Sequence, residues 1–227
     1  MELLFEDRDV TVAVKPAGML SEITENPFES FAASLAQRNE KHYIGVIHRL
    51  DRGVGGVMVY ARTPRAAARL CAAVQANELC KEYLAVVHGE LSSPEARLCN
   101  LLFHDRTRNK SFVVERERHG AKKASLSYRV LGVADSPLYG RVSLLLIRLE
   151  TGRTHQIRVQ FSHRGHPLVG DGKYGARDRC GIALFSHAIT LPHPISGKSI
   201  RLSAIPSESP WKELLALFDQ EMQRELS

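Results

Sequence analysis

Strand-length apolar segments are the feature of this sequence that most restricts how it can fold. Residues 82–88 (EYLAVVH) and 143–149 (SLLLIRL) are almost continuously apolar, which is typical of strands covered on both faces. Residues 124–130 alternate between apolar and polar side chains, so one face of that strand is expected to be buried. Further strands are predicted at residues 2–5, 10–14, 43–47, 56–61, 184–190 and 199–204. Strands therefore dominate the predicted structure.

Helix signals are fewer. Helix starts are predicted at Asn26-Pro27, Thr63-Pro64, Thr154 and Ser209-Pro210. In the first helix, Phe28 and Phe31 are one turn apart and predict the buried face. The segments do not alternate as βαβ units, and no G-x-G-x-x-G or phosphate-binding loop is present, so a nucleotide cofactor has no support. The expected fold class is α+β with a largely antiparallel sheet.

Length and composition fit one globular domain, which we expect to span residues 1–227 without a separate N-terminal RNA-binding domain. Hydrophobic residues make up 44% and charged residues 25%, values that argue against global disorder. No apolar run approaches the ~18 residues needed to span a bilayer, and the acidic start MELLFEDRDV does not resemble a signal peptide. Four scattered cysteines show no zinc spacing. We expect a cytoplasmic protein without a metal.

The charge balance is more informative about partners. Lys and Arg number 31 against 25 Asp and Glu, a formal net charge of +6. Cations gather in residues 104–130, which hold eight against three acids, and in residues 152–179, which hold six against two. A basic protein of this kind suits a polyanion, most commonly a nucleic acid. Either stretch, taken alone, is also compatible with an ordinary solvated surface.

The segment from His48 to Gly56 has features typical of a catalytic loop. Asp51 lies between Arg49 and Arg52, and nearby cations favour the ionised carboxylate that a nucleophile or base requires. Three of the four positions 53–56 are glycine, which permits a sharp turn and the close approach of a ligand. A surface ion pair in a strand connection is the alternative explanation for this segment alone.

Two other segments carry polar or aromatic groups at strand or helix ends. Tyr83 opens the apolar strand 82–88, where a ring can stack on a base or simply fill the core. Arg153, His155 and Arg158 lie at a predicted helix start, where backbone N–H groups and the helix dipole favour phosphate.

Together these segments resemble the RluA-like family of RNA pseudouridine synthases. HRLDR with its glycine-rich turn is similar to the catalytic motif of that family, KEYLAVVHG to its tyrosine motif, and TGRTHQIRVQFSHRGHPLVGDGKYG to its third motif. FEDRDVTVAVKPAGML and FSHAITLPHPISGKSIRLSAIP resemble the opening hairpin and the closing strands. The likeness runs from about residue 3 to about residue 206.

The resemblance implies a role for each residue of these motifs. Asp51 is the expected nucleophile, Tyr83 stacks on the target uracil, and Arg158 pairs with Asp51. Arg49 is expected to fill the space left by the flipped base. Contacts with RNA or a role in shaping the site are expected for His48, Arg49, Arg52, Lys122, Lys123, Arg153 and His155. The implied fold is a bent, mainly antiparallel sheet flanked by helices and loops, with the active-site cleft at its middle.

The implied activity is the isomerisation of uridine to pseudouridine in structured ribosomal or transfer RNA, by a monomer that needs no cofactor. Residues 104–130 are expected to act as a flexible finger that holds the RNA backbone. Two departures stand out: Val54-Gly55 replace the usual Thr-Ser, and Ser21-Glu22 replace the His-Pro that often follows the KPAG segment. An RNA-binding or ribosome-assembly protein without activity, and a uracil glycosylase, are the alternative functions.

Overall fold

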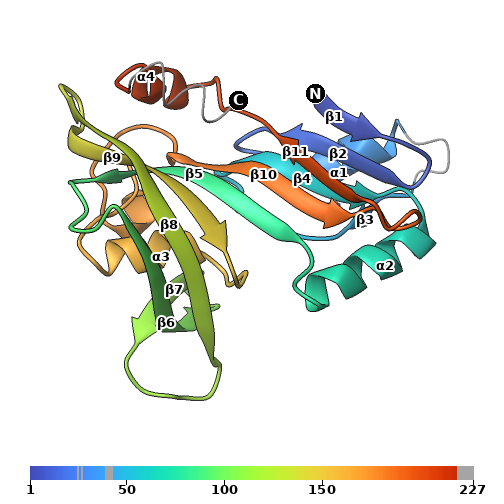
Figure 1. Ribbon diagram of the computed structural model, residues 1–227, viewed down its shortest axis with the longest axis horizontal. Coiled ribbons are helices and arrows are strands. Elements are labelled where there is room, and N and C mark those ends of the chain that lie inside the picture. The colour runs from blue at the N-terminus through green and yellow to red at the C-terminus, as the bar shows by residue number, and fades with distance from the viewer. Residues whose placement is uncertain (25, 27, 39–42, 219–227) are drawn as a thin grey trace. The chain divides into compact units, whose positions relative to one another are not determined.

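The computed structural model describes residues 1–24, 26, 28–38 and 43–218, and it divides the chain into two compact units. The first unit comprises Met1–Lys81 and Phe185–Pro206, and the second comprises Glu82–Leu184 and the chain from Ser207 onward. Each unit is described separately below, with the element labels of Figure 1. The single domain expected over residues 1–227 stays a prediction.

The first unit is a sheet with helices beside it. Its strands are β1 (Glu2–Glu6), β2 (Val10–Lys15), β3 (Gly45–Val46), β4 (Gly55–Ala61), β10 (Leu184–Pro192) and β11 (Ser199–Ser203). They follow the order β1-β2-β4-β10, with β3 paired to β4 and β11 to β10. The pairs β1/β2, β2/β4, β3/β4 and β10/β11 are antiparallel, whereas β10 runs parallel to β4.

Helix α2 (Pro64–Gln75) covers the core of this unit. Thr63 caps it by accepting the Ala66 N–H, and Pro64 stands in the first turn, as predicted. Leu70 is fully buried and packs with the valines of β2 and β4 in one apolar cluster. The helix lies beside the strand labelled β3 in Figure 1, with which it shares contacts.

Helix α1 (Phe31–Ala36) begins later than predicted. Its N-cap is Ser30, whose Oγ accepts the Ala33 N–H, whereas Asn26 was expected to cap it. The reason is a backbone bridge: Leu20 N–H donates to the Glu29 carbonyl and Phe31 N–H to the Leu20 carbonyl, which holds this segment extended. Phe28 is 90% exposed and so lies outside the predicted apolar face. Pro27 lies outside the described residues.

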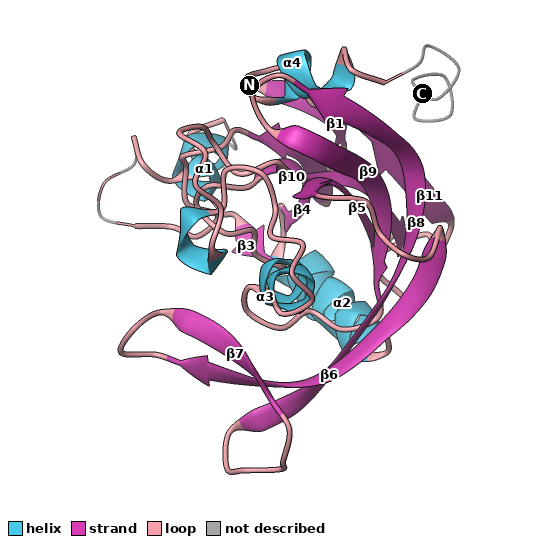
Figure 2. Cartoon of the chain, turned by 90° about the vertical axis from the view of Figure 1, so that its left-hand side faces the viewer, coloured by secondary structure: helices cyan, strands magenta, loops and turns pink. Residues whose placement is uncertain are grey.

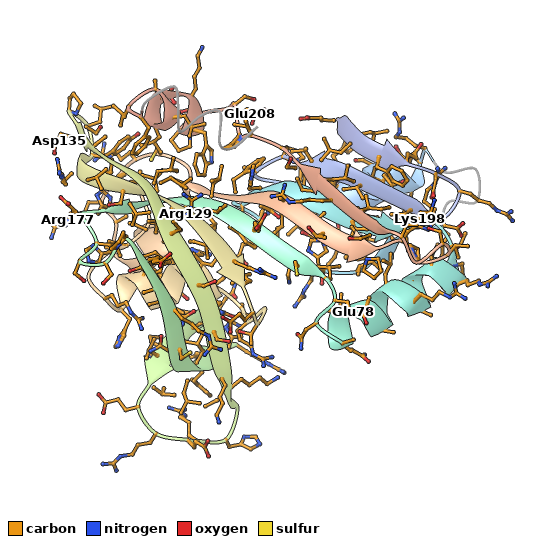
Figure 3. All side chains as sticks on the ribbon, viewed as in Figure 1. Glu78, Arg129, Asp135, Arg177, Lys198 and Glu208 are labelled. Carbon is orange, nitrogen blue, oxygen red and sulfur yellow. The ribbon has the colours of Figure 1, made fainter. Side chains whose placement is uncertain are left out.

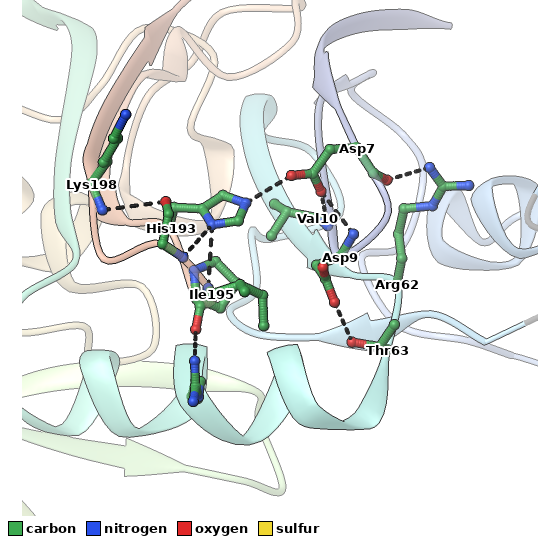
Figure 4. A network of polar contacts seen from close by, with 11 residues as sticks. Asp7, Asp9, Val10, Arg62, Thr63, His193, Ile195 and Lys198 are labelled. Atoms are coloured by element: carbon green, nitrogen blue, oxygen red, sulfur yellow. Dashed lines mark hydrogen bonds and ion pairs between the residues drawn. The ribbon is translucent and has the colours of Figure 1, made fainter.

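A polar network fastens the β10–β11 turn to the β1–β2 turn (Figure 4). His193 Nε2 lies 2.7 Å from Asp7 Oδ2, while His193 Nδ1 accepts the Ile195 N–H at 3.2 Å. Burial alone would raise the pKa of Asp7, but hydrogen bonds from the Asp9 and Val10 N–H groups and from His193 lower it. This network is far along the chain from the Asp51 segment and serves the fold of the unit.

The second unit is also a sheet with helices. Its strands are β5 (Cys80–His88), β6 (Glu95–Asp105), β7 (Lys110–Val114), β8 (Ala121–Ser136) and β9 (Gly140–Leu149). Its helices are α3 (Gln156–Ser162), the 3₁₀ turn η1 (Gly172–Tyr174) and α4 (Trp211–Leu215). The strand order is β5-β9-β8-β6-β7, with β6/β7, β6/β8 and β8/β9 antiparallel.

Helix α3 lies against one face of β6 and β8, as Figure 2 shows. The alternation predicted for residues 124–130 produces this face, since Ala124, Leu126 and Tyr128 are buried. Phe161 of α3 contacts Tyr128 edge-on, with ring centroids 5.5 Å apart. The N-cap of α3 is His155 in the left-handed conformation, not Thr154 as predicted. The Thr154 carbonyl instead accepts the Ser111 hydroxyl.

Residues 104–130 comprise the end of β6, all of β7, the start of β8 and the two connections between these strands, and their expected role as a flexible finger stays a prediction. Strand β6 pairs with β7 in antiparallel register from Leu101–Val114 to Asp105–Lys110. On its other edge, β6 pairs with β8 in antiparallel register from Glu95–Arg129 to Phe103–Ala121. Strands β6 and β7 lie in parts of the sequence where no strand was predicted.

The predicted α+β class with a largely antiparallel sheet is confirmed, because the strand pairs described above are antiparallel except for β4/β10. Among the residues that the structure describes, no helix combines the length and the apolar character needed to cross a bilayer. Within the same residues, no three His, Cys, Asp or Glu side chains come together as a metal site would require.

Candidate active site

Asp51 lies in a tight turn between β3 and β4 of the first unit. The Val54 N–H donates to the Asp51 carbonyl at 3.0 Å, which closes the turn, and Val54 is 2% exposed. The Asp51 side chain is half-buried. The glycine-rich segment thus holds a carboxylate next to a firmly anchored strand, as the sequence predicts.

The fully buried side chain of Lys15 supports this turn. Lys15 Nζ donates to the carbonyls of Pro16 at 2.9 Å, Met19 at 2.8 Å and Arg52 at 3.5 Å. Burial lowers the pKa of Lys15 to about 8, although the negative charge of Asp51 opposes that shift. Because 8 lies above neutral pH, the ammonium persists there and ties the KPAG segment to the Asp51 turn. Lys15 was not predicted as a site residue, although it is the first residue of the KPAG segment (residues 15–18).

The two residues that replace His-Pro also contact this turn. Ser21 is 4% exposed, and its Oγ both accepts the Leu50 N–H and donates to the Leu50 carbonyl, each at 3.0 Å. Glu22 Oε1 pairs with Arg49 Nη1 at 2.7 Å. Ser21-Glu22 therefore supply a brace for residues 49–50.

The replacement of Thr-Ser by Val54-Gly55 also has a steric reason. A Cβ on Gly55 would lie 3.2 Å from the Lys15 carbonyl oxygen and 3.3 Å from the Ala17 nitrogen. A serine at position 55 would therefore press on the backbone of the KPAG segment.

His48 is buried and neutral. It is 8% exposed, and its Nε2 accepts the Val59 N–H at 3.2 Å, which assigns the proton of the neutral ring to Nδ1. Burial, reinforced by the charge of Lys81, lowers the pKa of His48 to about 3. Nδ1 has no hydrogen-bond partner among the described residues. Because His48 lies in the interior, it is suited to supporting β4. Its contact with RNA stays a prediction.

The arginines that flank Asp51 point to solvent. The side chains of Arg49 and Arg52 are 66% and 57% exposed. Arg52 Nε donates to the Gly18 carbonyl at 2.9 Å, and its Nη2 lies 3.4 Å from Glu29. Both side chains are accessible, as a residue that contacts RNA must be.

In the second unit, Tyr83 and Arg158 are both 6% exposed. Tyr83 belongs to β5, the nearly continuous apolar strand predicted at residues 82–88. Arg158 belongs to α3, where its Nε and Nη2 donate to the two carboxylate oxygens of Asp171 at 2.7 and 2.8 Å. Asp171 was missed by the sequence analysis, although it lies within the quoted third motif.

A second missed residue, Tyr174, connects the rest of this network. The guanidinium of Arg158 lies 5.1 Å from the centre of the Tyr174 ring. The Tyr174 hydroxyl accepts the Ser111 N–H at 2.8 Å and lies 3.0 Å from His155 Nδ1. His155 is thus a buried partner of Tyr174, and its predicted role in shaping the site fits this position.

The remaining predicted RNA contacts lie at the surface of the second unit. Lys122 and Lys123 are exposed side chains near the start of β8, and Arg153 is exposed ahead of α3. Arg153 Nε donates to the Lys123 carbonyl at 3.0 Å, so these two segments lie side by side. Their accessible cations suit a phosphate backbone.

The structure therefore describes the predicted site as two halves, the Asp51 turn in one unit and Tyr83 with the Arg158 network in the other. The pairing of Asp51 with Arg158 stays a prediction.

Comparisons with known proteins cover both halves. A family model described as RNA pseudouridylate synthase matches residues 9–163, a range that contains Asp51, Tyr83 and Arg158. The ribosomal large subunit pseudouridine synthase D of Xanthomonas campestris is 34% identical over 238 residues, which cover 96% of this chain and 69% of that protein. The protein of the same name from Pseudomonas aeruginosa is 32% identical over 243 residues, which cover 97% and 72%.

The chain spans only part of these relatives. The Yersinia pestis protein of the same name is 35% identical over 189 residues, 79% of this chain but 54% of its own length. Among solved structures, human RNA pseudouridylate synthase domain containing 1 superposes with a TM-score of 0.77 at 20% identity, covering 99% of this chain and 94% of that one. At that identity the likeness is one of fold.

Proposed function

Because the chain belongs to the RNA pseudouridylate synthase family, and within it to the RluA-like members, we propose that it isomerises uridine to pseudouridine in structured RNA, with ribosomal RNA as the first candidate. The family match over residues 9–163 carries the proposal, since it spans every residue proposed to act on the base. The three relatives described above are named for the large ribosomal subunit. Cytoplasmic location and a monomeric state stay predictions of the sequence.

The reaction breaks the N1–C1′ bond of uridine, turns the uracil and forms a C5–C1′ bond. The C5 proton is lost and N1 gains one, so the change is redox-neutral and needs no energy input. The target base must first leave its stack, which costs a few kcal/mol and least where the base already lies in a loop.

Asp51 is the proposed nucleophile, which attacks uracil C6 or ribose C1′. Its half-buried carboxylate is presented by a turn that Lys15 and Ser21 hold in place, which suits a group that must react in one orientation. Tyr83 is proposed to stack on the flipped uracil, and Arg158 to pair with Asp51. Arg49 is proposed to occupy the space that the base leaves.

Tritium release from RNA labelled at uracil C5 measures the reaction directly. We expect the wild-type chain to release tritium and Asp51→Asn to lose at least about 10³-fold in rate, because the amide is no nucleophile. Asp135→Asn, which removes an exposed carboxylate (Figure 3), is the matched control and should keep the wild-type rate.

The same assay separates the alternatives. An inactive RNA-binding protein would bind the RNA and release no tritium, and a uracil glycosylase would liberate free uracil. Near-normal release by Asp51→Asn would show that Asp51 is not the nucleophile.

A further inference from the structure

The ion pair between Arg158 and Asp171 is deeply buried, more so than the other ion pairs described above. The side chain of Arg158 is 7% exposed and that of Asp171 is 0% exposed. Two N–H groups of Arg158 meet the two oxygens of Asp171 at 2.7 and 2.8 Å. Paired charges so far from water need a precise geometry, because each loses its hydration.

This geometry fixes the direction in which Arg158 can act. A guanidinium is planar, and the edge that carries Nε and Nη2 is occupied by Asp171. The edge that carries Nη1 therefore faces away from Asp171. The Tyr174 ring, 5.1 Å from the guanidinium carbon, limits rotation of that plane.

Asp171 does not depend on Arg158 for its own position. Its N–H donates to the Leu168 carbonyl at 3.0 Å, and its carbonyl accepts the N–H groups of Tyr174 at 3.0 Å and Ala176 at 3.2 Å. The backbone turn at the start of η1 thus fixes the position of Asp171, and the Asp171 carboxylate in turn orients the guanidinium of Arg158.

We propose that Asp171 is a positioning residue for catalysis, which fixes the plane of the Arg158 guanidinium and keeps its Nη1 edge turned away from Asp171. This inference rests on the proposed function, which assigns Arg158 to the Asp51 carboxylate. Because the side chain of Asp171 is fully buried against Arg158, Asp171 is proposed to act through Arg158 alone.

The direct test is Asp171→Asn, assayed by tritium release from C5-labelled RNA. The amide keeps the shape but offers one acceptor where Arg158 presents two donors, so the guanidinium loses its fixed orientation. We expect kcat to fall about 100-fold, as a displacement of about 1 Å does, with KM for the RNA unchanged. Asp135→Asn, which breaks an exposed ion pair with Arg141 in the same unit, is the matched control and should keep kcat.

A double variant separates positioning from a general loss of structure. In the Arg158→Ala background, Asp171→Asn should lower kcat no further, because nothing remains for it to orient. An additional loss in that background, or an unchanged kcat in the single variant, would overturn the inference.

Arg158→Lys provides a test that leaves Asp171 intact. The ammonium keeps the buried charge pair but has no second edge, so kcat should fall as far as in Arg158→Ala while thermal unfolding stays closer to wild type. Wild-type kcat in Arg158→Lys would overturn the inference. Absence of tritium release by the wild-type chain would instead refute the proposed function.

Discussion

At the scale of single residues, the histidine of the HRLDR segment behaves as part of the core. His48 accepts the Val59 N–H with Nε2, and burial lowers the pKa of His48 to about 3. A protonated ring would lose that hydrogen bond and place a charge in an apolar interior near Lys81. His48 therefore couples the stability of the first unit to pH.

The expected dependence follows from proton linkage. Between pH 6.5 and 3 the unfolded chain binds a proton at His48 and the folded chain does not, so stability falls as the pH falls through this range. From pH 7 to pH 5 this residue should cost about 2 kcal/mol of unfolding free energy. Urea unfolding at both pH values measures it.

The matched variants are His48→Gln and His119→Gln. His48→Gln keeps an acceptor for Val59 but cannot be protonated, so the loss between pH 7 and pH 5 should shrink by about 2 kcal/mol. His119 is exposed, so its replacement should leave the loss as in the wild type. An equal loss in His48→Gln and wild type would contradict the linkage.

At the scale of elements, the parallel contact between β4 and β10 depends on a position without a side chain. Gly56 has φ = +126°, and a Cβ there would lie 2.3 Å from the Ser186 carbonyl oxygen. Gly140, at the start of β9, has φ = +70° but open space around it. The two positions share a positive φ and differ in the room for a methyl group.

Gly56→Ala should therefore destabilise the protein by at least about 3 kcal/mol. The backbone of Ser186 would have to move away from the new methyl group, and residue 56 would have to adopt a φ that alanine disfavours. Gly140→Ala should cost only about 1 kcal/mol, the price of the positive φ. Chemical denaturation of both variants gives the comparison. An equal loss of stability in the two variants would show that β4 and β10 can move apart at Gly56 without a cost in free energy.

Elements with a strong local pattern could be predicted from sequence, whereas those decided by distant contacts could not. α2 has both its cap and its amphipathic spacing within twelve residues, and it forms as predicted. The N-cap of α1 lies four residues after the expected one, at Ser30 instead of Asn26, because Leu20 bridges to Ser30. β6 is recognisable only from its pairing with β8, and β7 only from its pairing with β6, which no local pattern encodes.

The contrast between local patterns and distant contacts also applies to the candidate site. Asp51 and its turn could be predicted, because the glycines and flanking arginines are neighbours in sequence. Lys15 was missed because its partners are backbone carbonyls, which leave no trace in side-chain patterns. Asp171 lies thirteen residues beyond Arg158, and only the fold of the 166–174 segment brings the two together.

At the scale of the whole molecule, the net charge of +6 is distributed unevenly among paired and accessible cations. Arg97 is paired with Glu150, and Arg141 with both Glu90 and Asp135. In these pairs the charge of each arginine is neutralised within the protein. The accessible lysines at the start of β8 are better placed to release counterions from RNA.

This argument predicts a change in salt dependence. Replacing Lys122 and Lys123 together by alanine should lower the slope of log K against log salt by about 1.5, since each lost phosphate contact removes about 0.7–0.9. Lys198, an exposed lysine of the first unit (Figure 3), is the matched control, and Lys198→Ala should leave the slope unchanged.

The measurement is fluorescence anisotropy of labelled ribosomal RNA fragments titrated at several NaCl concentrations. Lower affinity with an unchanged slope would mean that the two lysines act on protein structure rather than on phosphates. A drop in slope for Lys198→Ala as well would mean that the whole basic surface binds RNA, and the β8 lysines would then lose their special role. A drop confined to Lys122 and Lys123 would place the phosphate backbone along the start of β8, beside Arg153 and the network that holds Arg158.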